Sequence, residues 1–107
     1  MRLLEQAYDR RELGETNVRA IGTAVVRERF EAWRAQDRVA HTWLELARLA
    51  GFDSSSSVQR MLGEIANAPV TKGEVFYPGR VRATISVETG SRLVRAMGYA
   101  PSEVPGL

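Results

Sequence analysis

The sequence contains no cysteine, one histidine and one lysine in 107 residues. Without cysteine the chain has no disulfide, no thiolate metal site and no thiol nucleophile. Its single histidine, His41, supplies at most one member of a zinc site or a Ser-His-Asp triad, and we interpret it as a solvated loop residue. A phosphate-binding glycine loop and a cluster of metal ligands are also missing. These absences argue against an enzyme and predict no cofactor, no metal and no small-molecule substrate.

Long hydrophobic runs are missing as well. No apolar stretch approaches the roughly 20 residues of a membrane helix, and the N-terminal "MRLLEQAYDRRE" is too charged for a signal peptide. A composition of 44% hydrophobic and 26% charged residues is typical of a soluble globular protein. We therefore expect a single cytoplasmic domain over residues 1–107 that does not contact a membrane.

The basic residues are almost all arginine. The formal net charge is +2, and Lys72 is the one lysine among 15 basic residues. Arginine is well suited to forked contacts with phosphate and guanine. Because GC-rich coding produces the same bias, the arginine content alone does not identify a partner.

Two stretches before residue 40 have apolar residues at helical spacing. The first predicts a short amphipathic helix in an N-terminal extension over residues 1–15, with an apolar face made of Leu3, Leu4, Ala7 and Tyr8. The second predicts a longer helix capped by Asn17 or Thr16, with Arg27 on its wet side. Its apolar face consists of Val18, Ile21, Val25, Phe30 and Trp33. Core packing is the expected role of both tryptophans, Trp33 and Trp43.

Residues 42–65 predict two short helices joined by a tight turn. Thr42, followed three residues later by Glu45, has the spacing of a reciprocal capping box and opens the first helix. Gly51 ends that helix, and Val58 already belongs to the apolar face of the next. Residues 53–57 must therefore supply the second helix's cap and first turn, and Asp53 and Ser54 are both strong caps.

Proline and glycine interrupt residues 66–84, where "EVFY" and "RVRATI" have the composition of paired strands. We expect a wing-like loop or a small β-hairpin there. The stretch "KGEVFYPGRVR" is basic and carries two aromatics, which suits a wing along a phosphate backbone, and the alternative is a hairpin in which Phe76 and Tyr77 pack on the core. Residues 85–105 predict the C-terminal helix, capped by Ser86 and ended by Gly98, with a further turn at Pro101.

Four consecutive serines stand where the second short helix begins. At about 100° per residue from Val58, Ser56, Gln59, Arg60 and Gly63 point away from the core, and Ser55 lies at the margin. A short, polar first turn suits a helix whose N-terminal residues approach base edges in the major groove. Small hydroxyls also bind phosphates. The alternatives are that the serines form a solvated loop and that Gln59 and Arg60 lie on an ordinary solvent-exposed helix face.

This stretch resembles the helix-turn-helix of the Cro/repressor (XRE) family of phage and bacterial regulators. "TWLELARLAGFDSSSSVQRMLGEI" has the family's small residue at Ala47, its turn glycine at Gly51 and its paired apolar positions at Val58 and Met61. "ISVETGSRLVRAMGYAPSEV" looks like the family's fourth helix, and "AVVRERFEAWRAQ" would be its first. The resemblance covers about residues 20–105, and only residues 42–62 and 85–104 carry recognisable motifs.

The sequence therefore predicts an all-α helix-turn-helix bundle of about five helices, with the helix-turn-helix at residues 42–65. The predicted function is sequence-specific binding of duplex DNA as a small phage or bacterial transcriptional regulator. A homodimer is expected, with Leu3 to Leu13 as the contact. The alternative is a module of the same shape that binds a host factor or a toxin. The candidate DNA-binding residues are Ser54, Ser55, Ser56, Ser57, Gln59, Arg60, Lys72, Arg80 and Arg82.

Overall fold

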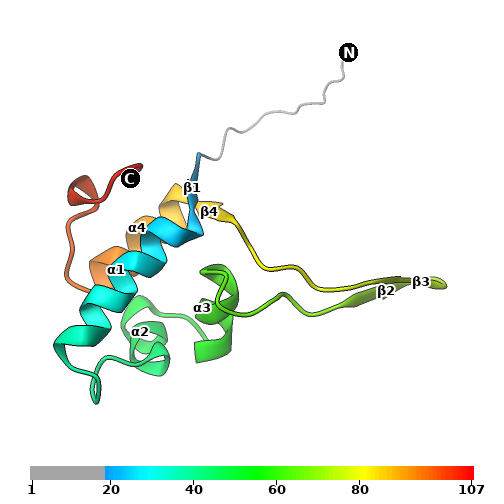
Figure 1. Ribbon diagram of the computed structural model, residues 1–107, viewed down its shortest axis with the longest axis horizontal. Coiled ribbons are helices and arrows are strands. Elements are labelled where there is room, and N and C mark those ends of the chain that lie inside the picture. Colours follow the sequence, from blue (N-terminus) through cyan, green and yellow to red (C-terminus); the bar gives the residue numbers. More distant parts are fainter. Residues whose placement is uncertain (1–18) are drawn as a thin grey trace, which may run out of the picture.

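The computed structural model describes residues 19–107 (Figure 1). The predicted helix at Leu3–Tyr8, the proposed contact at Leu3–Leu13 and the caps Thr16 and Asn17 lie outside the described residues. The elements, in chain order, are β1 (Ala20–Gly22), α1 (Thr23–Gln36), α2 (Trp43–Ala50), α3 (Ser55–Met61), β2 (Val70–Lys72), β3 (Val75–Tyr77), β4 (Thr84–Ser86), α4 (Val87–Ala96) and the single 3-10 turn η1 (Pro101–Glu103).

The prediction of an all-α domain is wrong, because two small antiparallel sheets join the four helices: β1 pairs with β4, and β2 pairs with β3. Ile21, which the apolar spacing places in a helix, lies in β1 opposite Ile85 of β4. This pairing buries both isoleucines and delays the start of α1 to Thr23. Gly22 is the N-cap of α1, so the prediction that Asn17 or Thr16 caps this helix is wrong. The stretch "RVRATI" therefore pairs with the N-terminal strand rather than with "EVFY", a long-range choice that local propensity does not reveal.

The core lies between the helices, with α4 packed against both α1 and α2. Trp33 is buried as predicted, and Phe30 stacks on Trp43 with ring centroids 3.9 Å apart. The His41 ring lies parallel to Trp33 at 4.0 Å, and its Nδ1 is 2.6 Å from the Trp33 carbonyl oxygen. The expectation of a solvated histidine is therefore wrong, since stacking half-buries the ring and places it at the end of α1. The side chains that solvent does not reach are Phe30, Leu46, Leu62, Leu93, Val26, Val58 and Val94.

The predicted helix ends agree with the structure where a single side chain or glycine sets them. The Thr42 hydroxyl accepts the Glu45 amide at the start of α2, and Gly51 ends α2 at φ +80°, where a residue without Cβ is favoured. The reciprocal half of the capping box is absent from this helix start, because the Glu45 carboxylate pairs with Arg48 instead, Oε1 to Nε 2.8 Å. Ser86 caps α4, and Pro101 opens the extra turn.

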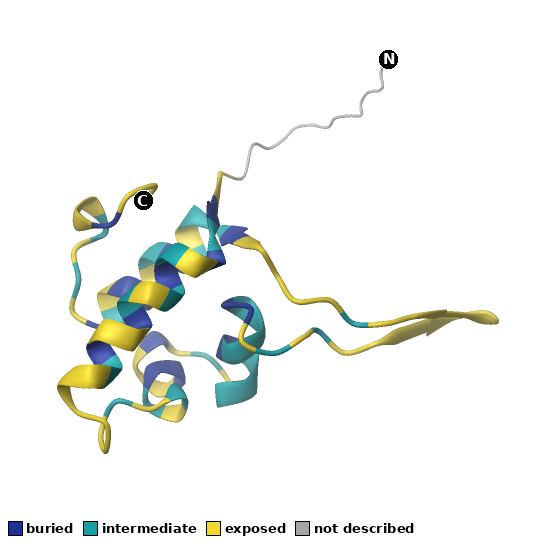
Figure 2. Ribbon diagram, viewed as in Figure 1, coloured by how far each residue is buried: buried dark blue, intermediate teal, exposed yellow. Residues whose placement is uncertain are grey.

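Residues 66–83 form a long hairpin that projects away from the helices (Figure 1). Its two arms meet near the helical body, where the Asn67 amide donates to the Arg80 carbonyl oxygen over 2.9 Å. Figure 2 shows the hairpin exposed along almost its whole length. Phe76 and Tyr77 are 63% and 51% exposed, so neither packs on the core. Within residues 19–107 no helix has both the length and the apolar character that crossing a membrane requires.

Candidate nucleic-acid interface

The serine run folds into a capped helix start. Ser54 is the N-cap of α3, and its hydroxyl accepts the Ser57 amide over 3.2 Å. The same oxygen lies 3.1 Å from the hydroxyls of both Ser56 and Ser57. The four residues Gly51 to Ser54 form the whole turn between α2 and α3. Ser54 is thus engaged in holding the helix start, whereas Ser55 is half-buried at the first position of the helix.

Beyond the serines, α3 presents Gln59 and Arg60 on the side opposite the buried Val58. Both side chains are half-buried rather than fully solvated. The Nε atom of Arg60 is buried and has no hydrogen-bond partner among residues 19–107, which is an uncommon state for a polar group in a folded protein. Gly63, predicted to share this outer face, is buried instead, because α3 ends at Met61 and the chain turns back toward the carbonyl oxygen of Arg82.

Two arginines outside the predicted DNA-binding set, Arg27 and Arg92, hold this helix pair in place. Arg92 of α4 donates from Nε to the Ala50 carbonyl oxygen (2.7 Å) and from Nη2 to that of Gly51 (3.1 Å), and its guanidinium lies over the Phe52 ring. Arg27 of α1 donates from Nη1 to the carbonyl oxygen of Leu62 (2.9 Å), just beyond α3. Satisfying carbonyl groups at helix ends in this way fixes the position of both helices.

The prediction that Arg27 lies on the wet side of its helix is therefore wrong. Its side chain is half-buried and also donates to the Gly63 carbonyl oxygen over 3.1 Å. Helical periodicity separates an apolar from a polar face, but it does not reveal that the end of another helix covers part of the polar face. No signal in the sequence identifies either arginine as an anchor.

The hairpin begins beside the end of α3. The Thr23 hydroxyl donates to the Arg82 carbonyl oxygen over 3.0 Å, so the second arm is attached to the start of α1. At the junction of the arms a Cβ on Gly79 would lie 1.6 Å from the Asn67 carbonyl oxygen, which leaves room for glycine only. The base of the hairpin is thus fixed to the helical body.

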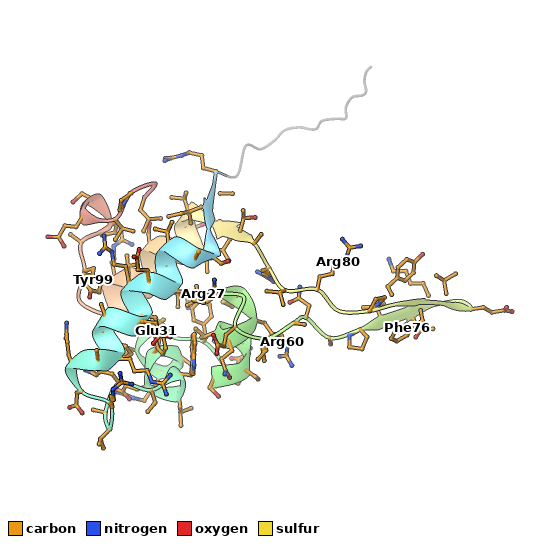
Figure 3. All side chains as sticks on the ribbon, in the orientation of Figure 1. Arg27, Glu31, Arg60, Phe76, Arg80 and Tyr99 are labelled. Carbon is orange, nitrogen blue, oxygen red and sulfur yellow. The ribbon has the colours of Figure 1, made fainter. Side chains whose placement is uncertain are left out.

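The candidate basic residues of the hairpin do not form one cluster. Lys72 lies in β2 at the distal end, whereas Arg80 and Arg82 are in the returning arm near its base. In Figure 3 the side chains of Arg80 and Phe76 project to opposite sides of the hairpin, and Arg60 lies on the same side as Phe76. The structure therefore brings Arg60 and the backbone of Arg82 to the α3 end of the hairpin and separates Lys72 from them.

The strongest local charge effect at this surface is on α2. The Arg48 guanidinium hydrogen-bonds the Glu45 carboxylate and lowers the pKa of that carboxyl group, and the same contact raises the pKa of Arg48. The two charges offset each other on α2. Arg60 within α3, and Arg92 at the turn that precedes the serine run, are cationic groups outside this pair.

No family model, no curated protein and no solved structure matches this chain. The resemblance to the Cro/repressor family therefore rests on the motifs alone.

Proposed function

We propose that the chain binds duplex DNA in a sequence-specific manner, as a cytoplasmic transcriptional regulator of phage or bacterial type. One observation carries the proposal: the polar outer face of α3 lies beside a projecting hairpin with arginines at its base (Figure 3). A short polar helix at such a position suits entry into the major groove, and an adjacent hairpin suits contact with the backbone.

We assign two roles to the residues at α3: some contact the DNA, and the others hold the start of the helix. The Gln59 amide is able to donate to and accept from an adenine edge, and Ser55 at the first turn is small enough to permit close approach. Ser54, Ser56 and Ser57 form the capping network that orients this turn. Arg60 has a buried, unpartnered Nε and a guanidinium suited to a phosphate or a guanine.

The hairpin contributes charge near the backbone. Arg82 follows the junction of the arms, where its main chain is bound to Thr23, and its side chain is exposed. We assign Arg82 to a phosphate contact, which supplies affinity but no base readout. Phe76 is 63% exposed and lies on the same side of the hairpin as Arg60 (Figure 3).

Selection of duplexes from a random pool, followed by titration of the selected and a scrambled duplex at several salt concentrations, tests the proposal. Each phosphate contact contributes about 0.9 to the slope of log K against log salt. We expect tighter binding to the selected duplex by at least about 10³-fold and a slope that decreases by about one in Arg82→Ala. Failure to enrich any sequence would contradict sequence-specific binding.

A protein-interaction module is the rival function, and one observation favours it: Val70, Val75 and Tyr77 expose apolar surface on one face of the distal hairpin. Scattered exposed apolar residues are common on protein surfaces, but a continuous group marks a contact site. Binding of a protein partner releases few counterions, so weak salt dependence would separate this function from DNA binding.

A further inference from the structure

The distal hairpin has an apolar face that nothing covers within the described residues. Val70 pairs with Tyr77 and Lys72 pairs with Val75, and paired residues of antiparallel strands point to the same side. Val70, Val75 and Tyr77 therefore share one face with Lys72, and the three apolar residues are 49%, 52% and 51% exposed. Phe76 lies on the other face with Thr71 as its pair. The hairpin thus has an apolar face and a separate face that carries the single aromatic ring of Phe76.

An isolated two-stranded hairpin is only marginally stable in water, and stability requires more strands or a covering layer. Within residues 19–107, neither the sheet formed by β1 and β4 nor any helix packs on β2 and β3, whose residues are all exposed. A partner surface that covers the apolar face would therefore stabilise the hairpin formed by β2 and β3.

We propose that this face, formed by Val70, Val75 and Tyr77, packs against the same face of a second copy of the chain. A two-fold arrangement makes the patch complementary to itself, because each residue meets an equivalent surface. The two hairpins point in opposite directions, so the turn of one lies just beyond the β2 and β3 strands of the other, on the side of its base.

Charge supports a second copy in this orientation. Glu74 stands at the turn of the hairpin, and Arg80 lies just beyond β3 near its base. The Arg80 side chain points to the side opposite Phe76, which is the side of the apolar face (Figure 3). In the antiparallel pair, Glu74 of each copy lies close to Arg80 of the other. The same acidic turn is unfavourable for insertion of the tip between DNA phosphates.

The contact area predicts a weak dimer. We take the contact to cover half of each apolar side chain, the stem of Lys72 and the strand backbone. Each copy then buries about 400 Å² of surface, and the pair about 800 Å². Stable complexes bury roughly 1,200–2,000 Å². A dissociation constant of about 10 µM to 1 mM is expected for such a contact. Dimer formation is therefore concentration-dependent for the protein alone.

The distance between the two hairpin bases also fits the spacing of half-sites on DNA, and this comparison alone rests on the proposed function. Each arm has seven extended residues from Ala66 to Lys72, about 23 Å. If two arms overlap by their three-residue strands, about 10 Å, the hairpin bases are about 36 Å apart. This separation is close to the roughly 34–36 Å between half-sites in adjacent turns of the duplex.

Sedimentation equilibrium of the full chain without DNA, from about 1 µM to about 1 mM, tests the proposal. The average mass is expected to rise with concentration from that of the 11.9 kDa monomer toward that of a dimer. Val75→Asp is expected to weaken the dimer by at least about tenfold, and Phe76→Asp, on the opposite face, by less than about twofold. Circular dichroism checks that both variants keep their helices, since the hairpin is outside the core.

A charge exchange provides the second test. Glu74→Arg alone is expected to weaken the dimer by about three- to fivefold, and its combination with Arg80→Glu to restore it. A chain that stays monomeric at the highest concentration, equal effects of the two aspartate variants, or no restoration by the exchange would each overturn the proposal. Because DNA is absent, none of these results bears on DNA binding by the monomer.

Discussion

Arg92 of α4 donates a hydrogen bond from Nε to the carbonyl oxygen of Ala50, the last residue of α2, over 2.7 Å. The same guanidinium reaches Gly51 and stacks on Phe52, so one side chain fixes the end of α2 and the turn that leads to α3. The orientation of the proposed reading helix therefore depends on a residue 32 positions beyond Arg60, in the C-terminal helix.

Replacement of Arg92 by methionine is expected to lower the free energy of unfolding by about 1–2 kcal/mol, because it removes charge-assisted hydrogen bonds from two carbonyl groups. Urea denaturation measures the change. Arg95→Met, one turn further along α4 and exposed, is the matched control and should cost less than about 0.5 kcal/mol. Equal losses in the two variants would show that Arg92 is not an anchor.

Gly51→Val is expected to destabilise the fold by about 2 kcal/mol or more. Valine is strained at φ +80°, and its Cβ would lie 3.1 Å from the Arg92 guanidinium. Gly98→Val separates the two causes, since Gly98 has φ +94° but no atom within 4 Å of the position that a Cβ would take. Thermal unfolding should therefore show a larger loss for Gly51→Val, and an equal or smaller loss would argue against crowding by Arg92.

Gly79→Ala is expected to open the base of the hairpin without unfolding the helices, because the new Cβ would overlap the Asn67 carbonyl oxygen. The amide signals of Asn67 and of residues 70–77 should change in NMR spectra, while the melting temperature falls by less than about 5 °C. Gly73→Ala, at φ +63° with open space around it, tests strain without overlap. A hairpin that is unchanged in Gly79→Ala would contradict the close contact of the arms.

Helix ends were predictable from the sequence because their determinants are local. Thr42, Ser54 and Ser86 cap the helices that follow them, and Gly51 ends α2 in the left-handed conformation expected of glycine. A cap acts through amides two or three residues away, so its effect is visible in a short window of sequence.

Features set by tertiary contacts were not predictable in this way. Ile21 has helical spacing to Val25 but pairs with Ile85, 64 residues later. Arg27 and Arg92 occur on helix faces that periodicity marks as polar, and their function depends on which carbonyl groups are placed opposite them. The separation of Lys72 from Arg60 likewise follows from the length of the hairpin arms rather than from any motif.

The central claim, that the outer face of α3 reads base edges, is tested most directly by Gln59→Ala on a selected and a scrambled duplex. The amide of Gln59 is expected to contribute about 1–3 kcal/mol on the selected duplex, or about 5- to 150-fold in affinity, and almost nothing on the scrambled one. Gln36→Ala, the same change at the exposed end of α1, is the control and should leave both affinities unchanged. Equal weakening on both duplexes, or no weakening on either, would contradict the claim that α3 reads the sequence.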